Sequence, residues 1–194
     1  FVLKQAEDGT AIGEVCRKHD LRLFMDGARF ANAMAHLKCH PADVTWKAGV
    51  DAISFGATKN GAMAVDAIVL FDTSLKPRIE QARKRSGHLH SKHRYLATQL
   101  LAYIKDDVWL KNSAHANTAA QALADVLIKQ GASLTHAAEG NELFVKMSPD
   151  LAAKLRDAGL MFHGWPSLGA DVYRFVAAWN ADIVQITKLN TTLG

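Results

Sequence analysis

The chain has 194 residues, of which 49% are hydrophobic and 22% are charged, which excludes an intrinsically disordered protein. Its net charge of +4 permits anionic ligands but is too small to indicate nucleic-acid binding by itself. Cys16 and Cys39 form neither a disulfide framework nor a metal pattern, so we interpret them as buried free thiols in a cytoplasmic protein. The best candidate for a membrane span, residues 62–71, is too short and contains Asp66.

The first half of the chain alternates between strands and helices. Residues 1–3 have the composition of a strand end, and no initiator methionine precedes them, so we expect an upstream portion that this chain lacks. Apolar spacing predicts a first helix after residue 10. A strand over 21–25, a helix over 30–38 and strands over 52–55 and 66–71 follow. Continuous apolar strands separated by helices predict a parallel sheet covered on both faces.

The second half has a different order of predicted elements, with shorter strands and tighter turns. We predict helices over 77–94, 95–110 and 117–130, and strands over 142–147, 160–163 and 172–178. Ser148 and Pro149 begin a helix that reaches about Asp157, and Asn180 is expected to cap a last helix. This pattern predicts an α/β domain over residues 1–88 followed by a small α+β domain over residues 89–194.

Three polar residues come directly after two of the predicted strands. Asp26 and Arg29 follow the first strand, and Lys59 follows the second. In parallel sheets, ligands gather at the carboxyl ends of the strands. A lysine amine that loses part of its water shell becomes a nucleophile toward an aldehyde. An acid and an arginine on one strand end and a lysine on the next therefore match the needs of pyridoxal phosphate (PLP) chemistry.

Each of the three residues also has a simpler interpretation. A carboxylate such as Asp26 keeps a pyridine nitrogen protonated, and Arg29 offers a bidentate donor to a carboxylate or to the phenolate oxygen of the cofactor. Alone, the same pair is equally consistent with a turn and a helix-start salt bridge. Lys59 alone would be a solvated loop lysine. Their shared position at successive strand ends favours a site.

Two motifs make the chain resemble a known family. Residues 23–33 (LFMDGARFANA) and 54–61 (SFGATKNG) resemble the low-specificity L-threonine aldolases of the aromatic amino acid β-eliminating lyase group. Residues 6–10 (AEDGT) and 171–176 (DVYRFV) resemble the same family. The resemblance covers the whole chain. It implies the aspartate aminotransferase type of fold (fold type I), here the C-terminal part of the large parallel-sheet domain and the small α+β domain.

The resemblance also implies roles for named residues. Lys59 would carry PLP on its amine, Asp26 would pair with the ring nitrogen, and Arg29 and Arg174 would hold the carboxylate of the amino acid. From the residues alone, Arg174 is better interpreted as a solvent-facing position of an alternating strand. The implied activity is that of a lyase that cleaves L-threonine, L-allo-threonine and related β-hydroxy-α-amino acids to glycine and an aldehyde. The family is homo-oligomeric, so we expect a homodimer or homotetramer.

Some expected parts of the site are not in this sequence. The family places its phosphate-binding glycine turn and its ring-stacking histidine upstream, so we expect the site to be incomplete in this polypeptide alone. After Lys59, Asn60-Gly61-Ala62-Met63 departs from the Gly-Leu-Gly-Ala-Pro of many members.

Two alternatives remain open. The first is another fold-type-I PLP enzyme, either a β-eliminating lyase or an aminotransferase, because lysine and aspartate are common to all of them. The second is a polyanion-binding or nucleic-acid-binding protein that uses the basic residues between 83 and 94, although no aromatic residues interleave the run Arg83-Lys84-Arg85. His88, His90 and His93 lack a completing carboxylate or thiol, so we expect no metal. We also expect no nucleic-acid partner.

Overall fold

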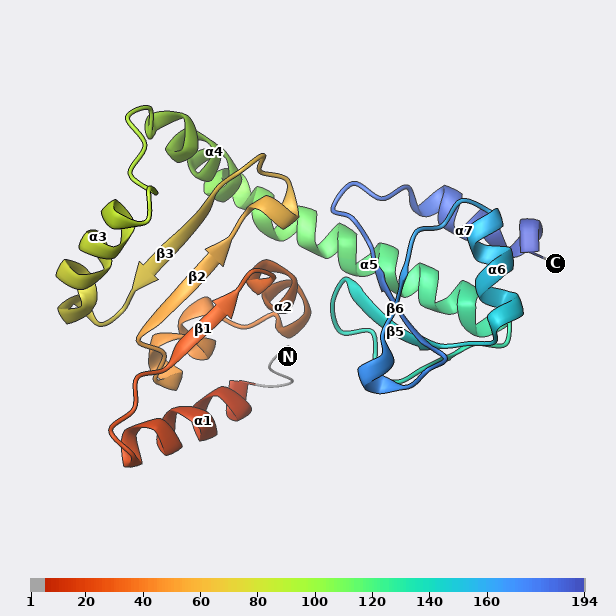
Figure 1. Cartoon of the computed structure of the whole chain (residues 1–194), viewed down its shortest axis with the longest axis horizontal. Helices are drawn as coiled ribbons and strands as arrows, with labels where there is room; N and C mark the ends of the chain where they lie inside the picture. Colours follow the sequence, from red (N-terminus) through yellow and green to blue (C-terminus); the bar gives the residue numbers. More distant parts are fainter. Residues whose placement is uncertain (1–5, 194) are drawn as a thin grey trace. The chain divides into compact units, whose positions relative to one another are not determined.

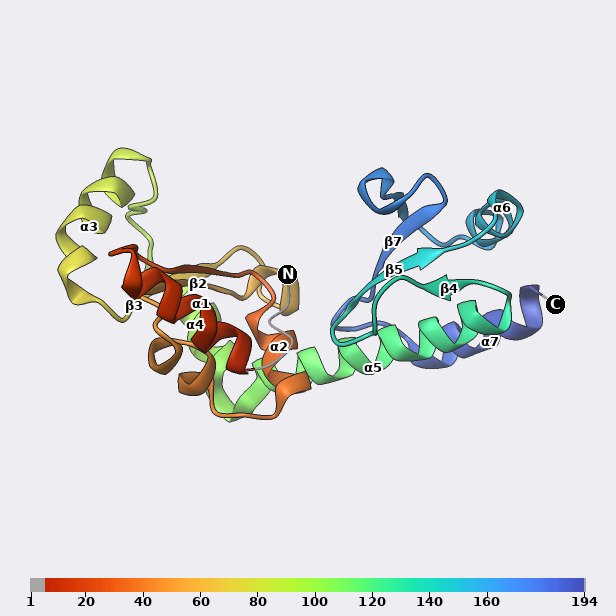
Figure 2. The same ribbon diagram turned by 90° about the horizontal axis from the view of Figure 1, so that it is seen from below.

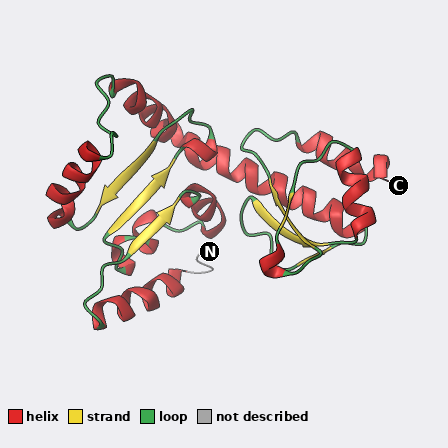
Figure 3. Ribbon diagram, viewed as in Figure 1, coloured by secondary structure: helices red, strands yellow, loops and turns green. Residues whose placement is uncertain are grey.

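The computed structural model describes residues 6–193. The strand end expected at residues 1–3 lies outside the described residues. The chain forms two compact units, one up to Lys111 and one from Asn112 onward. Each unit contains its own sheet, drawn in yellow in Figure 3. No helix in the described residues is long and apolar enough to cross a membrane.

The first unit is built on a three-stranded sheet with the order β1-β2-β3 (Figure 1). Strands β1 (Phe24–Gly27) and β2 (Ala52–Gly56) are parallel, with Asp26 opposite Ser54. Helices of this unit are α1 (Ala6–Lys18), α2 (Phe30–Leu37), α3 (Lys76–Arg85) and α4 (Arg94–Ile104). The predicted domain boundary after residue 88 lies within this unit, between α3 and α4, and stays a prediction.

The third strand corrects the expectation of a wholly parallel sheet. Strand β3 (Asp66–Leu70) runs antiparallel to β2, and Asp66 lies opposite Gly56. Only residues 57–65 separate the two strands. A parallel crossover needs a dozen or more residues, so this connection is long enough only for a return in the opposite direction.

Helix α2 and an aromatic cluster cover one face of the sheet in the first unit. Phe30 and Met34 lie one turn apart on α2 and pack with Ile53 of β2. The ring of Trp109 stacks on Phe30 with centroids 6.4 Å apart and meets Phe55 edge-on at 5.6 Å. Each such pair contributes about 0.5–1.5 kcal/mol beyond its buried area. This cluster therefore fixes β2, the strand that leads to Lys59.

The second unit packs helices on one face of an antiparallel sheet with the order β4-β5-β7-β6. Its strands are β4 (Ser133–Leu134), β5 (Glu142–Lys146), β6 (His163–Gly164) and β7 (Val172–Val176). Its helices are α6 (Pro149–Asp157), α7 (Ile183–Leu193) and most of α5 (Val108–Lys129), whose first residues belong to the first unit. In Figure 2, α5 and α7 run side by side along the same face of the sheet. The core residues Leu143, Val145 and Phe175 point to that face.

Several local predictions can be compared with the structure. Ser148 accepts a hydrogen bond from the N–H of Leu151 at the start of α6, which confirms the predicted cap. The predicted cap at Asn180 is wrong, because Asp182 accepts the N–H groups of Val184 and Gln185 before α7. Asp182 lies directly before the helix, where a short carboxylate reaches the free N–H groups of the first turn. The two cysteines are unpaired but half-buried, not buried.

Candidate active site

The turn that carries Lys59 is tied to the beginning of strand β3. Lys59 is the middle residue of a short 3₁₀ turn (Thr58–Asn60) just past β2. The N–H groups of Ala57 and Thr58 both donate to Oδ1 of Asp66, at 2.8 and 3.1 Å. The Thr58 hydroxyl donates to the carbonyl of Val65 and accepts its N–H, at 3.2 and 3.0 Å. The hydroxyl of Thr58 therefore stabilises the turn by binding both backbone groups of Val65.

A buried pair holds the other side of the turn. Nδ2 of Asn60 donates to the hydroxyl of Tyr103 at 2.7 Å and to the carbonyl of Trp109 at 2.8 Å. The Tyr103 hydroxyl in turn donates to the carbonyl of Gly56 at 3.4 Å. Asn60 and Tyr103 are each only 3% exposed, and burial raises the pKa of Tyr103 above 10.0. The backbone around Lys59 is therefore anchored from both sides.

The side chain of Lys59 is exposed at the carboxyl edge of the sheet. Its amine has no ion-pair or hydrogen-bond partner among residues 6–193. From the sequence we expected a Lys59 amine that had lost part of its water shell. The described residues of this unit leave the side chain exposed, so they do not remove that water. They fix the backbone of Lys59 and leave its amine unpaired.

Asp26 shows the same combination of a fixed backbone and an open functional atom. Its Oδ1 accepts the N–H of Ala28 at 3.0 Å and the hydroxyl of Ser54 at 3.3 Å, and that hydroxyl accepts the N–H of Gly27. Its Oδ2 has no hydrogen-bonding partner in the part of the chain that the structure describes. Ser54 therefore orients Asp26 so that one carboxylate oxygen is available to a ligand.

Two glycines allow the turns after β1 and β2 to touch. A Cβ atom at Gly56 would lie 2.7 Å from the Cα atom of Ala28. A Cβ atom at Gly27 would lie 2.4 Å from the carbonyl oxygen of Ser54. Only glycine permits such a close approach of two backbones. The structure thus brings the turn of Asp26 and the turn of Lys59 together at one edge of the sheet.

The two predicted arginines lie in different units. Arg29 is half-buried and comes just before α2, where its carbonyl accepts the N–H groups of Asn32 and Ala33. Arg174 lies on β7, and its Nε atom is 3.0 Å from Oε1 of Glu142. The side chain of Arg174 is 27% exposed, so it is neither buried in the core nor fully in solvent.

Sequence reasoning missed the residues that support the site. Ser54 and Asn60 lie inside the motif 54–61, yet nothing in the motif indicates their partners. Asp66 was noticed only as a charge in an apolar stretch. Tyr103 lies 43 positions after Asn60, so no local periodicity connects the two.

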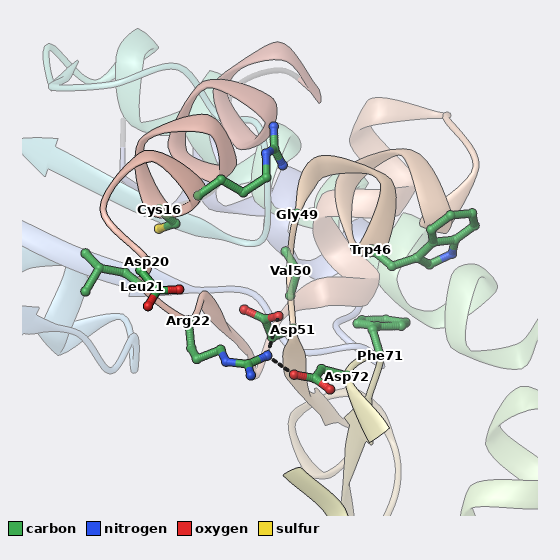
Figure 4. Close-up of a pocket in the computed structure, with 11 residues that line it drawn as sticks. Cys16, Asp20, Leu21, Arg22, Trp46, Gly49, Val50, Asp51, Phe71 and Asp72 are labelled. Atoms are coloured by element: carbon green, nitrogen blue, oxygen red, sulfur yellow. Dashed lines mark hydrogen bonds and ion pairs between the residues drawn. The ribbon is translucent and has the colours of Figure 1, made fainter. Parts of the chain in front are cut away.

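A cavity of about 580 Å³ lies at the opposite edge of the same sheet (Figure 4). Arg22 extends across it and forms ion pairs with Asp51 and Asp72. Asp51 also accepts the N–H of Leu23 at 2.7 Å. The lining residues are Cys16, Arg17, Asp20, Leu21, Arg22, Trp46, Gly49, Val50, Asp51, Phe71 and Asp72. Neither Asp26 nor Lys59 contributes to this cavity.

The basic run of the alternative hypothesis lies at the end of α3. Lys84 and Arg85 are exposed, whereas Nε of Arg83 donates to the carbonyl of His88 at 3.3 Å. Within the described residues, no three His, Cys, Asp or Glu side chains gather to hold a metal ion.

The fold belongs to a recognisable class. The structure superimposes on Sphingomonas wittichii serine palmitoyltransferase with a TM-score of 0.61 at 16% identity, over 95% of this chain and 49% of that one, a likeness that shows the fold alone. Leishmania major threonine aldolase gives a TM-score of 0.87 at 26% identity, over 97% of this chain and 56% of that one. The class is the fold-type-I PLP enzymes, which confirms the predicted fold class.

The sequence comparisons narrow this class to a family. The model of the beta-eliminating lyase family matches residues 5–150. The low specificity L-threonine aldolase of Pseudomonas aeruginosa is 39% identical over 180 residues, and that of Pseudomonas sp. strain NCIMB 10558 is 37% identical. The chain belongs to the beta-eliminating lyase family. It covers 51% of the length of both Pseudomonas proteins, with 92% of its own residues aligned.

Proposed function

We propose that the complete protein is a PLP-dependent aldehyde-lyase. It cleaves L-threonine, L-allo-threonine and related β-hydroxy-α-amino acids to glycine and an aldehyde. The observation that carries this proposal is the pair Asp26 and Lys59 on touching turns, each with a fixed backbone and an unpaired functional atom. The identity of 39% to a low specificity L-threonine aldolase supports the choice of substrate class.

The chemistry of the donor set fits the cofactor. Lys59 would hold PLP through its amine, and Oδ2 of Asp26 would face the protonated ring nitrogen, because Oδ1 is already engaged by Ala28 and Ser54. Arg29 lies directly before α2 and three residues after Asp26, and its guanidinium would serve the substrate carboxylate. When bound, PLP supplies an electron-withdrawing ring that stabilises negative charge at Cα of the substrate.

The chain's own residues then determine which bond breaks. Arg29 and Arg174 would hold the substrate carboxylate and so would orient the Cα–Cβ bond of the substrate for cleavage. The carboxylate of Asp26 would lie beside the ring nitrogen and would favour its protonated form.

We further propose that the protein acts in the cytoplasm as a homodimer or homotetramer. The family resemblance supports self-association, and the two unpaired cysteines are consistent with a reducing compartment. Nucleic acid has no part in this proposal.

Product analysis tests the proposed reaction. The cofactor-loaded complete protein is incubated with L-threonine, and glycine and acetaldehyde are expected in equal amounts. Ammonia with 2-oxobutanoate would instead identify a β-eliminating lyase. A keto acid formed by amine transfer would identify an aminotransferase. Either of these two results would overturn the proposal.

A further inference from the structure

Arg174 lies on the face of its sheet that is opposite the hydrophobic core. Side chains alternate along a strand, so Leu143 and Phe175 point toward the helices while Glu142 and Arg174 point away from them. Arg174 lies directly opposite Phe144, and Glu142 is the diagonal neighbour on β5. We call this side of β5, β7 and β6 the outer face.

An ion pair on the outer face holds one edge of the guanidinium. Nε of Arg174 is buried and lies 3.0 Å from Oε1 of Glu142. Both side chains are only 27% exposed, so water screens this pair less than a fully exposed one. Glu142 is itself held by the five-residue ladder between β5 and β7. The carboxylate of Glu142 is therefore a fixed neighbour of Arg174.

An aromatic ring holds the face of the same guanidinium. Cζ of Arg174 lies 5.2 Å from the centroid of the Trp165 ring. Trp165 is fixed in turn. Its ring meets the ring of Phe144 edge-on, with centroids 5.7 Å apart, and its backbone N–H donates to the carbonyl of Val172 at 2.7 Å. The guanidinium thus has one edge against a carboxylate and one face against an indole.

This arrangement leaves the two Nη atoms to a ligand. A guanidinium binds a carboxylate with two parallel N–H groups, either through Nε and one Nη or through both Nη atoms. Oε1 of Glu142 lies 3.0 Å from Nε and occupies the space at that edge as an ion-pair partner, without an aligned hydrogen bond, so the second mode remains. We propose that Glu142 and Trp165 are positioning residues, which orient Arg174 so that its Nη atoms receive the α-carboxylate of an amino acid. This inference rests on the proposed function.

The sign of one kinetic effect separates positioning from competition. If Glu142 positions Arg174, removal of its charge loosens the guanidinium and weakens substrate binding. If Glu142 instead competes with the substrate for Arg174, removal of its charge strengthens binding. A role limited to stability would change the melting temperature and leave KM unaltered.

The test compares Glu142→Gln with a matched control in the cofactor-loaded complete protein. Glu142→Gln is expected to raise KM for L-threonine about tenfold and to change kcat less than about twofold. Glu142→Asp keeps the charge and is expected to restore part of the loss. Glu139→Gln makes the same charge change on a nearby residue and is expected to leave both constants unaltered.

A binding measurement supplies a readout that does not need turnover. The protein is labelled with 5-fluorotryptophan, and the ¹⁹F signal of Trp165 is assigned through Trp165→Phe. Titration with glycine is expected to shift this signal saturably, whereas glycinamide, which lacks the carboxylate, is expected to leave it in place. Glu142→Gln is expected to weaken the glycine response about tenfold.

Arg174→Lys separates failure of this inference from failure of the proposed clamp. An unchanged KM in Arg174→Lys would remove Arg174 from the substrate site and so overturn both the clamp and the inference. A raised KM in Arg174→Lys with an unchanged or lowered KM in Glu142→Gln would overturn the positioning role alone. The inference stands if both variants raise KM and the Trp165 signal responds to glycine but not to glycinamide.

Discussion

The two edges of the β1–β3 sheet hold similar residues and use them differently. At the amino edge, beside the cavity, Arg22 pairs with Asp51 and Asp72, so each of these charged groups has a partner within the chain. At the carboxyl edge, Asp26 and Lys59 stand on fixed turns, yet Oδ2 of one and the amine of the other have no partner within residues 6–193. The charged side chains at the amino edge stabilise the fold through ion pairs, whereas Asp26 and Lys59 at the carboxyl edge are available to a ligand.

The contrast between the two edges shows how a ligand site can be recognised in this fold. The cavity marks the edge whose acids are already engaged, so hollow space alone is a poor guide here. The useful sign is a polar atom that is left open while hydrogen bonds fix the backbone that carries it. A fixed backbone around an unpaired charged group does not stabilise the fold through that group, and this combination is typical of a functional site.

The largest expected effect comes from removing the amine at the carboxyl edge. Lys59→Ala should lower kcat for threonine cleavage on the order of 10³-fold or more, because the cofactor loses its covalent attachment. The melting temperature should hardly change, because the side chain is exposed. Acetaldehyde release and thermal unfolding measure the two effects. Lys76→Ala, another exposed lysine of the same unit, is the control and should keep full activity.

Matched aspartate variants compare the two edges directly. Asp26→Asn should lower kcat about 10²-fold with little loss of stability, because it removes the charge beside the ring nitrogen. Asp51→Asn should lower the free energy of unfolding by about 1 kcal/mol, since it weakens the bond to the N–H of Leu23, and should leave kcat within about twofold. Chemical denaturation and steady-state kinetics check both variants. The reverse pattern would contradict the assignment of the two edges.

A glycine pair tests whether the touching turns matter. Gly56→Ala should destabilise the protein by about 1–3 kcal/mol and lower kcat, because the new Cβ atom would lie 2.7 Å from the backbone of Ala28 and push the turns apart. Gly140→Ala is the control, since no described atom outside its immediate chain neighbours lies within 4 Å of its added Cβ, and its effect should stay within about 0.5 kcal/mol. Equal effects at the two positions would show that the close approach is unimportant.

The smallest effect concerns the buried tyrosine behind the Lys59 turn. The pKa of Tyr103 is raised by burial above 10.0, so the folded state holds this proton more tightly than the unfolded state. The stabilisation is complete below pH 10 and is lost as the pH rises above that value through the folded pKa. Tyr103→Phe should cost about 1 kcal/mol near neutral pH and should flatten this alkaline decline. Denaturation at pH 8 to 11 measures it, and an unaltered slope would contradict the burial argument.

Local patterns predicted most elements of the fold. The strand over 52–55, the helix over 30–38 and the cap at Ser148 are confirmed, because each depends on neighbours within one or two turns. The direction of β3 was predicted wrongly, since a strand's composition does not record which way it runs in the sheet. The length of the connection 57–65 carried that information, and counting its residues would have corrected the prediction.

The candidate site was predicted in its exposed residues and missed in its supports. Asp26, Arg29 and Lys59 could be proposed because each is a chemically distinctive residue just past a strand. Ser54, Asn60 and Tyr103 could not, because their contribution lies in hydrogen bonds between residues 28 to 47 positions apart. The contact between Arg174 and Glu142 has the same origin, since it depends on the register of two strands far apart in the sequence.

Borohydride reduction of the complete, cofactor-loaded protein, followed by peptide mapping, determines which lysine carries the cofactor. Reduction makes any bond between the cofactor and a lysine permanent, so the labelled peptide identifies that lysine. We predict a single label on Lys59 and its disappearance in Lys59→Ala. A label on another lysine, or no label in a protein that still cleaves threonine, would contradict the account.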